Sequence, residues 1–217
     1  MPSRRDKNTL TAIANILKDF DIVALQEVDS GSRRTGFVNQ SASLAAQAGF
    51  GFYHQQATRR LGNIARQGNT LLSRITPHSL TPYKLPGLIP GRGLLKAEFG
   101  SKQDPIVLIM VHLSLGTHSR KKQLDYVKEL LQDYQHIIVM GDMNCSLHTP
   151  EMSDLIRALG LVAPLEQLPT FPSWQPTRHI DHILVSESLK VERSYVLPHK
   201  LSDHLPLGTD ILLPYSL

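Results

Sequence analysis

The sequence predicts an α+β fold in which a mixed two-sheet core is covered by helices. Segments with strand character outnumber those with helical periodicity, and the two kinds are not strictly interleaved along the chain. This order argues against a purely parallel sheet with alternating helices. The length of 217 residues is common for a single domain of this kind, so we expect one domain over 1–217.

Composition excludes several classes of protein. A lone Cys145 allows neither an intramolecular disulfide framework nor a cysteine-based zinc site. The longest apolar run, 106–111, is far shorter than the ~20 residues that cross a bilayer. We therefore expect a cytoplasmic protein without a membrane span. A net charge of +4 and a pI near 9.2 favour polyanionic partners such as nucleic acid or a phospholipid surface.

The chain begins with a predicted helix and a predicted strand. Apolar residues recur at three- and four-residue intervals from Asp6, a candidate N-cap, to Phe20. This spacing is typical of an amphipathic helix. The apolar run at 21–27 is too short for a helix and rich in branched residues, so it predicts a buried strand that ends at Glu27.

The next segments alternate between helix, loop and strand. Helical periodicity over 38–48 is followed by Gly49, which is a common residue after a helix end. We expect a loop over 51–68 and a strand over 69–74. The density of proline and glycine at 76–92 forbids a long helix and predicts strand edges or an irregular loop near the site.

The middle of the chain predicts a hairpin, a helix and another strand. Two apolar runs, 93–99 and 106–113, flank a short turn-forming segment and predict a β-hairpin. Ser119 is a candidate cap for a helix that extends to Tyr134. The apolar segment 136–140 that follows predicts a buried strand.

The last third predicts one helix and two strands. Thr149 precedes Pro150, which is favoured at the first helical position, and Gly160 is a candidate stop for this helix. Apolar runs at 180–185 and 207–212 predict the two final strands.

Polar groups follow or begin several of these strands. They are Gln26-Glu27, His112, Asp142 to Asn144, Asp181 and Asp203-His204. A carboxylate next to a buried strand is costly unless it is hydrogen-bonded, paired or bound to a cation. Because several such groups stand at separate strand ends, we expect them to converge on one cleft. Their oxygen donors favour Mg²⁺ or Mn²⁺ over zinc, which points to phosphoester cleavage.

Six motifs occur in the order found in the endonuclease/exonuclease/phosphatase superfamily, which is also called DNase I-like. They are Leu-Gln-Glu-Val-Asp at 25–29, Gly-Asn-Thr-Leu-Leu-Ser-Arg at 68–74, Val-His-Leu at 111–113, Gly-Asp-Met-Asn at 141–144, Ile-Asp-His-Ile at 180–183 and Ser-Asp-His-Leu-Pro at 202–206. The sequence resembles this family, and most of all its bacterial metal-dependent hydrolase branch, to which segment 29–40 is similar.

The resemblance implies a four-layer α/β/β/α sandwich with the site at the edge where the two sheets meet. Family members begin with a strand that carries an Asn, and this chain starts after it. We therefore expect a single domain that is truncated at its N-terminus relative to the family. A vacant sheet position would leave backbone groups unpaired, so we expect weak activity or poor stability.

The resemblance also implies roles for single residues. Glu27 corresponds to the metal-binding glutamate of the family, and Asp203 to the aspartate that shares or approaches the metal. His204 corresponds to the histidine that contacts the scissile phosphate. Asp181 corresponds to the carboxylate that orients this histidine.

Further positions match residues that act on water or on the substrate. Asp142 and Asn144 correspond to the pair that activates the attacking water and holds the phosphate. His112 stands where some family members have a second histidine that binds phosphate or donates a proton. We expect Asn69 and Arg34 to bind substrate.

Other polar residues have simpler interpretations. His182 is expected in the core or behind the site, because its strand alternates apolar residues. Basic residues such as Arg120 are expected either in solvent or along a phosphate-binding face.

The resulting prediction is a monomeric, divalent-metal-dependent phosphodiester hydrolase, with nucleic acid as the first candidate substrate. A sphingomyelinase-like or other lipid-headgroup phosphodiesterase is the alternative, and an exposed apolar loop at 85–90 would favour it. An inactive binding module that retains the fold is a third hypothesis. The intact acidic and histidine motifs argue against it.

Overall fold

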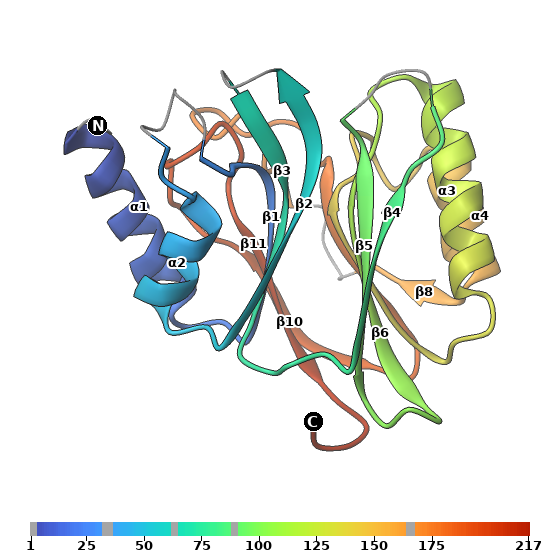
Figure 1. The fold of residues 1–217 in the computed structure, drawn as a ribbon. Coiled ribbons are helices and arrows are strands. Elements are labelled where there is room, and N and C mark those ends of the chain that lie inside the picture. Colours follow the sequence, from blue (N-terminus) through green and yellow to red (C-terminus); the bar gives the residue numbers. More distant parts are fainter. Residues whose placement is uncertain (1–3, 32–36, 62–64, 88–90, 164–167) are drawn as a thin grey trace.

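In the computed structural model, two layers of β-sheet face each other and helices cover their outer sides (Figure 1). The structure describes residues 4–31, 37–61, 65–87, 91–163 and 168–217. One outer layer contains α1 (Arg4–Leu17) and α2 (Gln40–Ala48), and the other contains α3 (Thr117–Leu131) and α4 (Pro150–Ala158). This is the α/β/β/α arrangement that the resemblance predicts. No helix among these residues is long and apolar enough to cross a membrane.

The larger sheet has six strands. Its order is β4 (Ser79–Lys84), β5 (Gly93–Gly100), β6 (Pro105–His112), β7 (His136–Asp142), β9 (Asp181–Ser186) and β8 (Leu161–Val162). Strands β6 and β7 are parallel and are joined through α3, whereas the other neighbours are antiparallel. Strand β4 lies at one edge of this sheet. It contains Pro82, and proline, which has no N–H to donate, is tolerated in edge strands.

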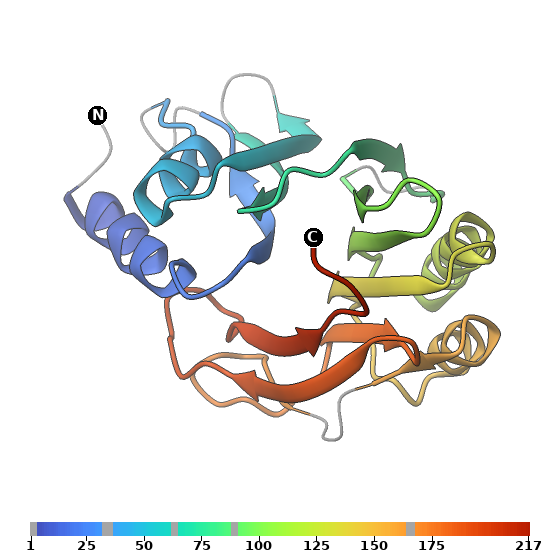
Figure 2. The same ribbon diagram turned by 90° about the horizontal axis from the view of Figure 1, so that it is seen from below.

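The opposite layer consists of two separate sheets in the described part of the chain. One has the order β1 (Ile22–Asp29), β3 (Ala65–Ser73) and β2 (Phe52–Leu61). The other pairs β10 (Lys190–Val196) with β11 (Leu207–Leu212). The view from below shows β10 and β11, coloured red, apart from the blue strand β1 (Figure 2).

Strand β6 shows how the core is organised. Its residues 106–111 are nearly inaccessible to solvent. Ile109 and Val111 pack in a cluster with residues of α3 and α4, whereas Leu108 and Met110 pack in a second cluster between the sheets. A third cluster joins α1 and α2 to β3. The continuous apolar sequence of β6 is therefore explained by burial on both faces.

The structure corrects several predictions of secondary structure. The loop predicted over 51–68 is wrong, because β2 spans most of this segment and pairs with β3 along its length. Polar side chains in β2 hide the strand from a test based on apolar alternation. The charged strand β10 and the two-residue β8 escaped prediction for similar reasons.

Two predicted helix starts differ from the structure, whereas one predicted start and one predicted end agree with it. Helix α1 begins before Asp6, and α3 begins at Thr117, after Gly116, so neither Asp6 nor Ser119 is the N-cap. Thr149 does precede Pro150 at the start of α4. Gly49 adopts a left-handed conformation (φ 77°) at the end of α2, as predicted.

Candidate active site

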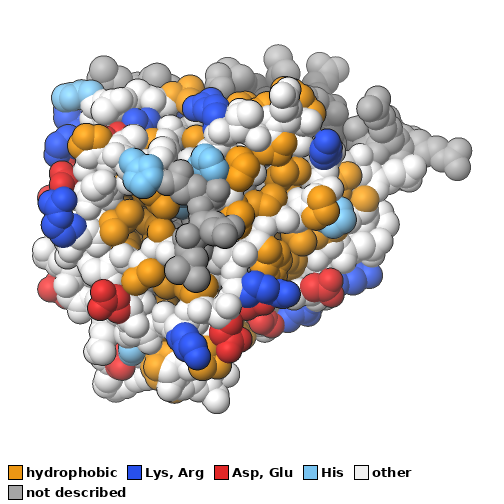
Figure 3. All heavy atoms as spheres, turned by 180° about the vertical axis from the view of Figure 1, so that it is seen from behind, with side chains coloured by type: hydrophobic (Ala, Val, Ile, Leu, Met, Phe, Trp, Pro, Cys, Tyr) orange, Lys and Arg blue, Asp and Glu red, His pale blue; other side chains and the backbone are white. Residues whose placement is uncertain are grey.

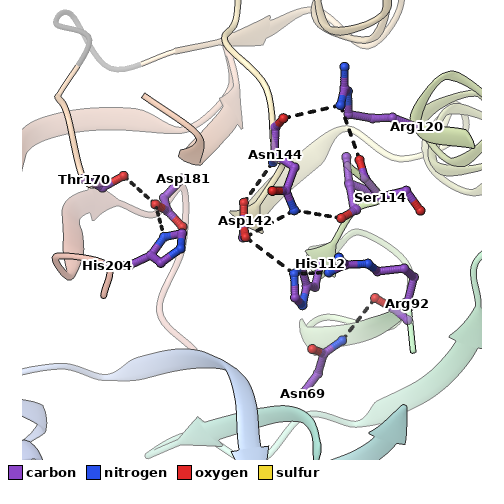
Figure 4. Close-up of polar contacts among 12 residues, drawn as sticks. Asn69, Arg92, His112, Ser114, Arg120, Asp142, Asn144, Thr170, Asp181 and His204 are labelled. Atoms are coloured by element: carbon purple, nitrogen blue, oxygen red, sulfur yellow. Dashed lines mark hydrogen bonds and ion pairs between the residues drawn. The ribbon is translucent and has the colours of Figure 1, made fainter. Parts of the chain in front are cut away.

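Three predicted site residues lie side by side on three neighbouring strands. His112 pairs with Asp142 in the β6–β7 ladder, and Asp142 pairs with Asp181 in the β7–β9 ladder. Neighbouring strands are about 4.8 Å apart. The backbone register therefore brings an imidazole and two carboxylates together at one end of the larger sheet, with Asp142 in the middle (Figure 4).

His204 joins this row from the loop before β11. Its Nδ1 lies 2.8 Å from Oδ2 of Asp181, and the Thr170 hydroxyl donates to the same oxygen. The backbone of Leu205 donates to the Thr170 carbonyl, and the ring of Phe171 lies 4.8 Å from that of His204. These contacts hold the imidazole against its carboxylate, as the resemblance implies for Asp181.

The turn after β7 fixes the position of the Asp142 side chain. Gly141 has a φ of 135°, and a Cβ atom there would lie 2.0 Å from the Val111 carbonyl oxygen, so only glycine fits. The Asn144 backbone N–H donates to Oδ1 of Asp142 at 2.9 Å. The Asn144 amide donates to the Leu113 carbonyl at 2.9 Å and to Asp142 Oδ2 at 3.3 Å. Asn144 therefore orients Asp142 in this structure.

Burial and neighbouring charges shift the pKa values of the residues in the row. Burial and the neighbouring charge of Asp181 raise the pKa of Asp142 to about 6. Burial alone would lower the pKa of His204, but the hydrogen bond and charge of Asp181 outweigh it and raise this pKa. The result is a carboxylate that titrates near neutrality beside an imidazole that favours its charged form.

His112 has the opposite character. Burial and the charges of Arg92 and His204 lower the pKa of His112 to about 3. The Arg92 guanidinium contacts Nε2 of His112 and can only donate, so this nitrogen carries no proton. Nε2 lies 3.5 Å from Asp142 Oδ2, and with a neutral imidazole this contact is not an ion pair.

A buried ion pair supports the row from behind, and sequence reasoning did not find it. Arg120 on α3 donates to Glu151 on α4 at 2.8 and 2.9 Å, and both side chains are buried. Arg120 also donates to the carbonyl oxygens of Leu115 and Asn144. The expectation that Arg120 lies in solvent or on a phosphate-binding face is wrong, because its side chain is buried against Glu151. Nothing in the sequence reveals this contact.

The two predicted metal ligands lie outside the row. Glu27 is exposed and has a φ of 57°, at a point where the β1–β3 register shifts. Asp203 is also exposed, and its backbone carbonyl accepts from Ser173. Both residues line one cavity with Asp181 and His204. Their predicted role in metal binding stays a prediction.

The predicted substrate-binding residues and His182 lie at different places. Asn69 is buried on β3, and its amide donates to the Gly93 carbonyl at 3.1 Å, a contact that connects the two sheet layers. Arg34 lies outside the described residues. The Nε2–H of His182 donates to the Cys145 carbonyl oxygen at 2.7 Å, and the side chain is buried, as expected for a residue of the core.

The residues present fit a divalent cation. Among the described residues, Asp142, Asp181 and His204 offer ligand atoms that all lie within 4.8 Å of one another. Two carboxylates and an imidazole around one point are donors that Mg²⁺ or Mn²⁺ accepts.

Family comparison adds an independent line of argument. The sequence matches the Endonuclease/Exonuclease/phosphatase family over residues 1–204. The chain belongs to this family. Members of the superfamily are hydrolases that act on phosphoester bonds. A search of curated proteins finds no match.

Solved structures confirm the fold. The endonuclease/exonuclease/phosphatase from Beutenbergia cavernae has a TM-score of 0.76 at 22% identity, over 94% of this chain and 66% of that protein. A mannosyl-6-phosphatase from Bacteroides thetaiotaomicron has a TM-score of 0.76 at 18% identity, covering 95% and 91%. The human Nocturnin catalytic domain, with bound sulfate, has a TM-score of 0.74 at 17% identity, covering 97% and 87%.

Proposed function

We propose that this protein is a divalent-metal-dependent phosphodiester hydrolase and that nucleic acid is its substrate. The observation that carries the proposal is the row of His112, Asp142 and Asp181, with His204 hydrogen-bonded to Asp181. In this row, a carboxylate with a pKa of about 6 lies near an imidazole that favours its charged form. Such a pair can remove a proton from water and stabilise negative charge on phosphate.

Each residue of the row has a separate task in this proposal. The Asp142 carboxylate accepts a proton from the attacking water, and Asn144 holds that carboxylate in place. Asp181 binds Nδ1 of His204, which leaves Nε2–H free to donate to a non-bridging phosphate oxygen. Neutral His112 and Arg92 form the other wall, where Arg92 offers charge to the phosphate.

A divalent ion completes the chemistry of this site. When bound, Mg²⁺ or Mn²⁺ polarises the phosphoryl group and offsets the charge that develops on it. Glu27 and Asp203 would hold it, because their exposed carboxylates line the same cavity as Asp181 and His204. The tighter group of Asp142, Asp181 and His204 would then act on water and phosphate beside the ion. Three carboxylates and no lysine or arginine line the cavity among the described residues, so we expect phosphate binding to depend on the metal.

One feature bears on the choice between nucleic acid and a lipid headgroup. The net charge of +4 suits either substrate, because both are anionic. An exposed apolar loop at 85–90 would favour the lipid, but Leu85 is buried in the core cluster beneath α3. Residues 88–90 lie outside the described part of the chain.

The proposal is tested with four substrates in the presence and absence of Mg²⁺. They are plasmid DNA, bis-p-nitrophenyl phosphate, p-nitrophenyl phosphate and sphingomyelin vesicles. We expect metal-dependent cleavage of the first two. Cleavage of the monoester alone, or of sphingomyelin alone, would overturn the assignment, and cleavage of none would favour the binding module.

Variants then connect the activity to the row. Asp142→Ala and His204→Ala should each lower turnover on the diester at least ~100-fold, given the typical effect of a general base or a charge-stabilising group. His78→Ala is the matched control, because His78 is exposed and its backbone bonds to Glu98, toward the end of β5 opposite the residue that pairs with His112. An active, folded His204→Ala protein contradicts the proposed mechanism.

A further inference from the structure

The only tryptophan of the chain is exposed on a loop beside the candidate active site. Trp174 is 65% exposed and belongs to segment 171–178, which we call the tryptophan loop. Loops on a rigid scaffold are where proteins place many of their binding residues. A large ring that stays in water contributes little to folding, so the contacts of this loop are informative about its purpose.

Hydrogen bonds fix the shape of the tryptophan loop. Phe171 and Arg178 form an isolated β-bridge at its base, where the Arg178 N–H donates to the Phe171 carbonyl at 2.9 Å. Inside the loop, the Gln175 N–H donates to the Pro172 carbonyl at 3.0 Å. Trp174 is therefore held at the tip of a closed loop, so its ring extends from a defined backbone position.

Further contacts attach the tryptophan loop to the candidate active site. The Ser173 N–H donates to the Asp203 carbonyl at 2.8 Å, and the Ser173 hydroxyl donates to the Ser202 carbonyl at 2.6 Å. Asp203 lines the cavity of the site together with His204. Trp174 directly follows Ser173, so the two Cα atoms are ~3.8 Å apart. The indole is therefore attached next to the residues proposed to hold the ion and the phosphate.

Two cationic side chains accompany Trp174. Lys200 is exposed, and its ammonium donates to the Trp174 carbonyl at 3.5 Å. Arg178 is exposed, and its guanidinium lies 5.5 Å from the centre of the Phe171 ring. Seen from behind, the molecule shows hydrophobic side chains gathered in the middle, with histidine, lysine and arginine side chains around them (Figure 3). Aromatic rings combined with cations are typical of surfaces that bind single-stranded nucleic acid.

We infer that Trp174 is a stacking platform for one base of the substrate and that Lys200 binds the phosphate next to that base. The inference rests on the proposed function and names its substrate more closely. Stacking accepts every base, because each has a π-face. Within a duplex the neighbouring base pairs cover these faces, whereas an unpaired base offers them to a protein ring. The preferred substrate is therefore single-stranded nucleic acid or the unpaired end of a duplex.

A lipid surface is the other partner that an exposed tryptophan can suit, because indoles also collect at membrane interfaces. Membrane contact needs a contiguous apolar area. The exposed side chains of Gln175, Arg178 and Lys200 around Trp174 are polar or charged, and Leu201, at 37%, is much less exposed than the indole. A single ring beside cations suits a base and its phosphate better than a bilayer.

The first experiment uses the fluorescence of Trp174, which reports on this position alone because the chain has one tryptophan. The full chain carrying Asp142→Ala is titrated in Mg²⁺ with a thymidine octanucleotide and with an abasic octanucleotide of the same charge. A base stacked on the indole quenches its emission, so we expect saturable quenching by the thymidine strand and far less by the abasic strand. Adding Lys200→Gln should lower the slope of log affinity against log salt by ~0.7, because one phosphate contact is lost.

The second experiment compares two diesters that share the scissile bond and the p-nitrophenol leaving group. Thymidine 5′-(p-nitrophenyl phosphate) carries a base, and methyl p-nitrophenyl phosphate does not. Trp174→Ala should lower the ratio of their kcat/KM values ~5- to 150-fold, the range for one stacked base, and Trp174→Phe should recover most of this ratio.

Tyr53→Ala is the matched control, because Tyr53 is an exposed aromatic residue on β2. Its partner Leu72 pairs with Val23 near the start of β1, whereas Glu27 lies near the end of that strand. We expect the ratio of the two kcat/KM values to be the same in this variant as in the parent.

Three outcomes overturn the inference. Equal quenching by the two octanucleotides, or an unchanged kcat/KM ratio in Trp174→Ala, shows that no base stacks on the indole. Binding of a labelled thymidine strand without quenching shows the same. A blue shift of the emission on phosphatidylserine vesicles, without a response to the thymidine strand, assigns Trp174 to a lipid surface.

Failure of the proposed function is a separate result. It appears as an unaltered protein that cleaves neither diester in Mg²⁺. The fluorescence titration needs no activity, so it still shows whether Trp174 binds a base.

Discussion

Strands β6 and β1 have similar apolar sequences but very different surroundings. Residues 106–111 of β6 are almost fully buried, whereas residues 22–25 of β1 are half-buried. β6 has a paired neighbour on each side and a packed layer on each face, whereas β1 pairs with β3 alone in the part of the chain that the structure describes. An apolar composition predicts that a segment forms a strand. The number of neighbouring strands and layers then decides how much its burial contributes to the free energy of folding.

The candidate active site follows the same division. His112, Asp142 and Asp181 come from the fully paired sheet and have many fixed contacts. Glu27 comes from the half-exposed strand and has an irregular backbone. The site residues with the most fixed contacts therefore stand on the fully paired sheet, and the predictions below test this difference.

The largest effect is expected at the buried ion pair of the fully paired half. Arg120→Ala should lower the free energy of unfolding by about 3–5 kcal/mol, because it leaves Glu151 buried without its partner. Arg193→Ala is the matched control in the two-stranded sheet. Its ion pair with Asp210 is exposed, so about 1 kcal/mol or less is expected. Urea unfolding of both variants gives the comparison.

A double variant separates the ion pair from the space it fills. Arg120→Met with Glu151→Leu should be less destabilising than Arg120→Ala, because no unpaired charge stays buried. If the Arg120→Ala and Arg193→Ala proteins unfold at the same urea concentration, the two halves do not differ in this respect.

The second effect compares one residue type on the two strands. Ile109→Ala should cost about 2–5 kcal/mol, because Ile109 is fully buried in the core beneath α3. Ile22→Ala should cost about 1 kcal/mol, because Ile22 is only half-buried on β1. Urea unfolding measures both, and equal costs at the two positions would contradict the difference between the strands.

The smallest effect is a pH dependence of stability. The pKa of His112 is lowered from 6.5 to about 3, so below pH 6.5 the unfolded chain binds a proton that the folded chain does not. Stability from this group is therefore complete above pH 6.5 and is lost as the pH falls toward 3. Thermal melts between pH 7 and 4.5 in chelator should show a smaller loss in His112→Gln than in its parent.

The choice of background matters for this measurement. The raised pKa of Asp142 gives the opposite slope, because its stability is present below pH 3.8 and is lost as the pH rises through about 6. Both proteins should therefore carry Asp142→Asn. His54→Gln is the matched control on half-buried β2, where burial lowers the histidine pKa. An equal effect at His54 would show that the two halves do not differ.

Much of the fold was predictable because its signals are local. The apolar run of β6, the proline after Thr149 and the glycine after α2 each specify a structure within a few residues. Strand β2 could not be found in this way, because its side chains are polar and its stability comes from pairing with β3. The division of the second layer into two smaller sheets could not be predicted either, because it depends on which strands pair with one another.

The candidate site was predictable where a polar residue ends an apolar strand. Asp142 and His112 carry this signal, and their register was implicit in the strands that precede them. Thr170, Arg92 and Glu151 carry no such signal, because they reach the site from loops and from a second helix. Only the packed structure shows which side chains they meet.

Because His112, Asp142 and Asp181 are paired across neighbouring strands, the backbone ladder sets the spacing of these site residues. Distances between these residues are set by hydrogen bonds that repeat along the whole sheet. The connecting loops can consequently change length without altering the spacing. A one-residue deletion inside β7 has the opposite result, because it turns every later side chain of the strand to the other face and removes Asp142 from the row.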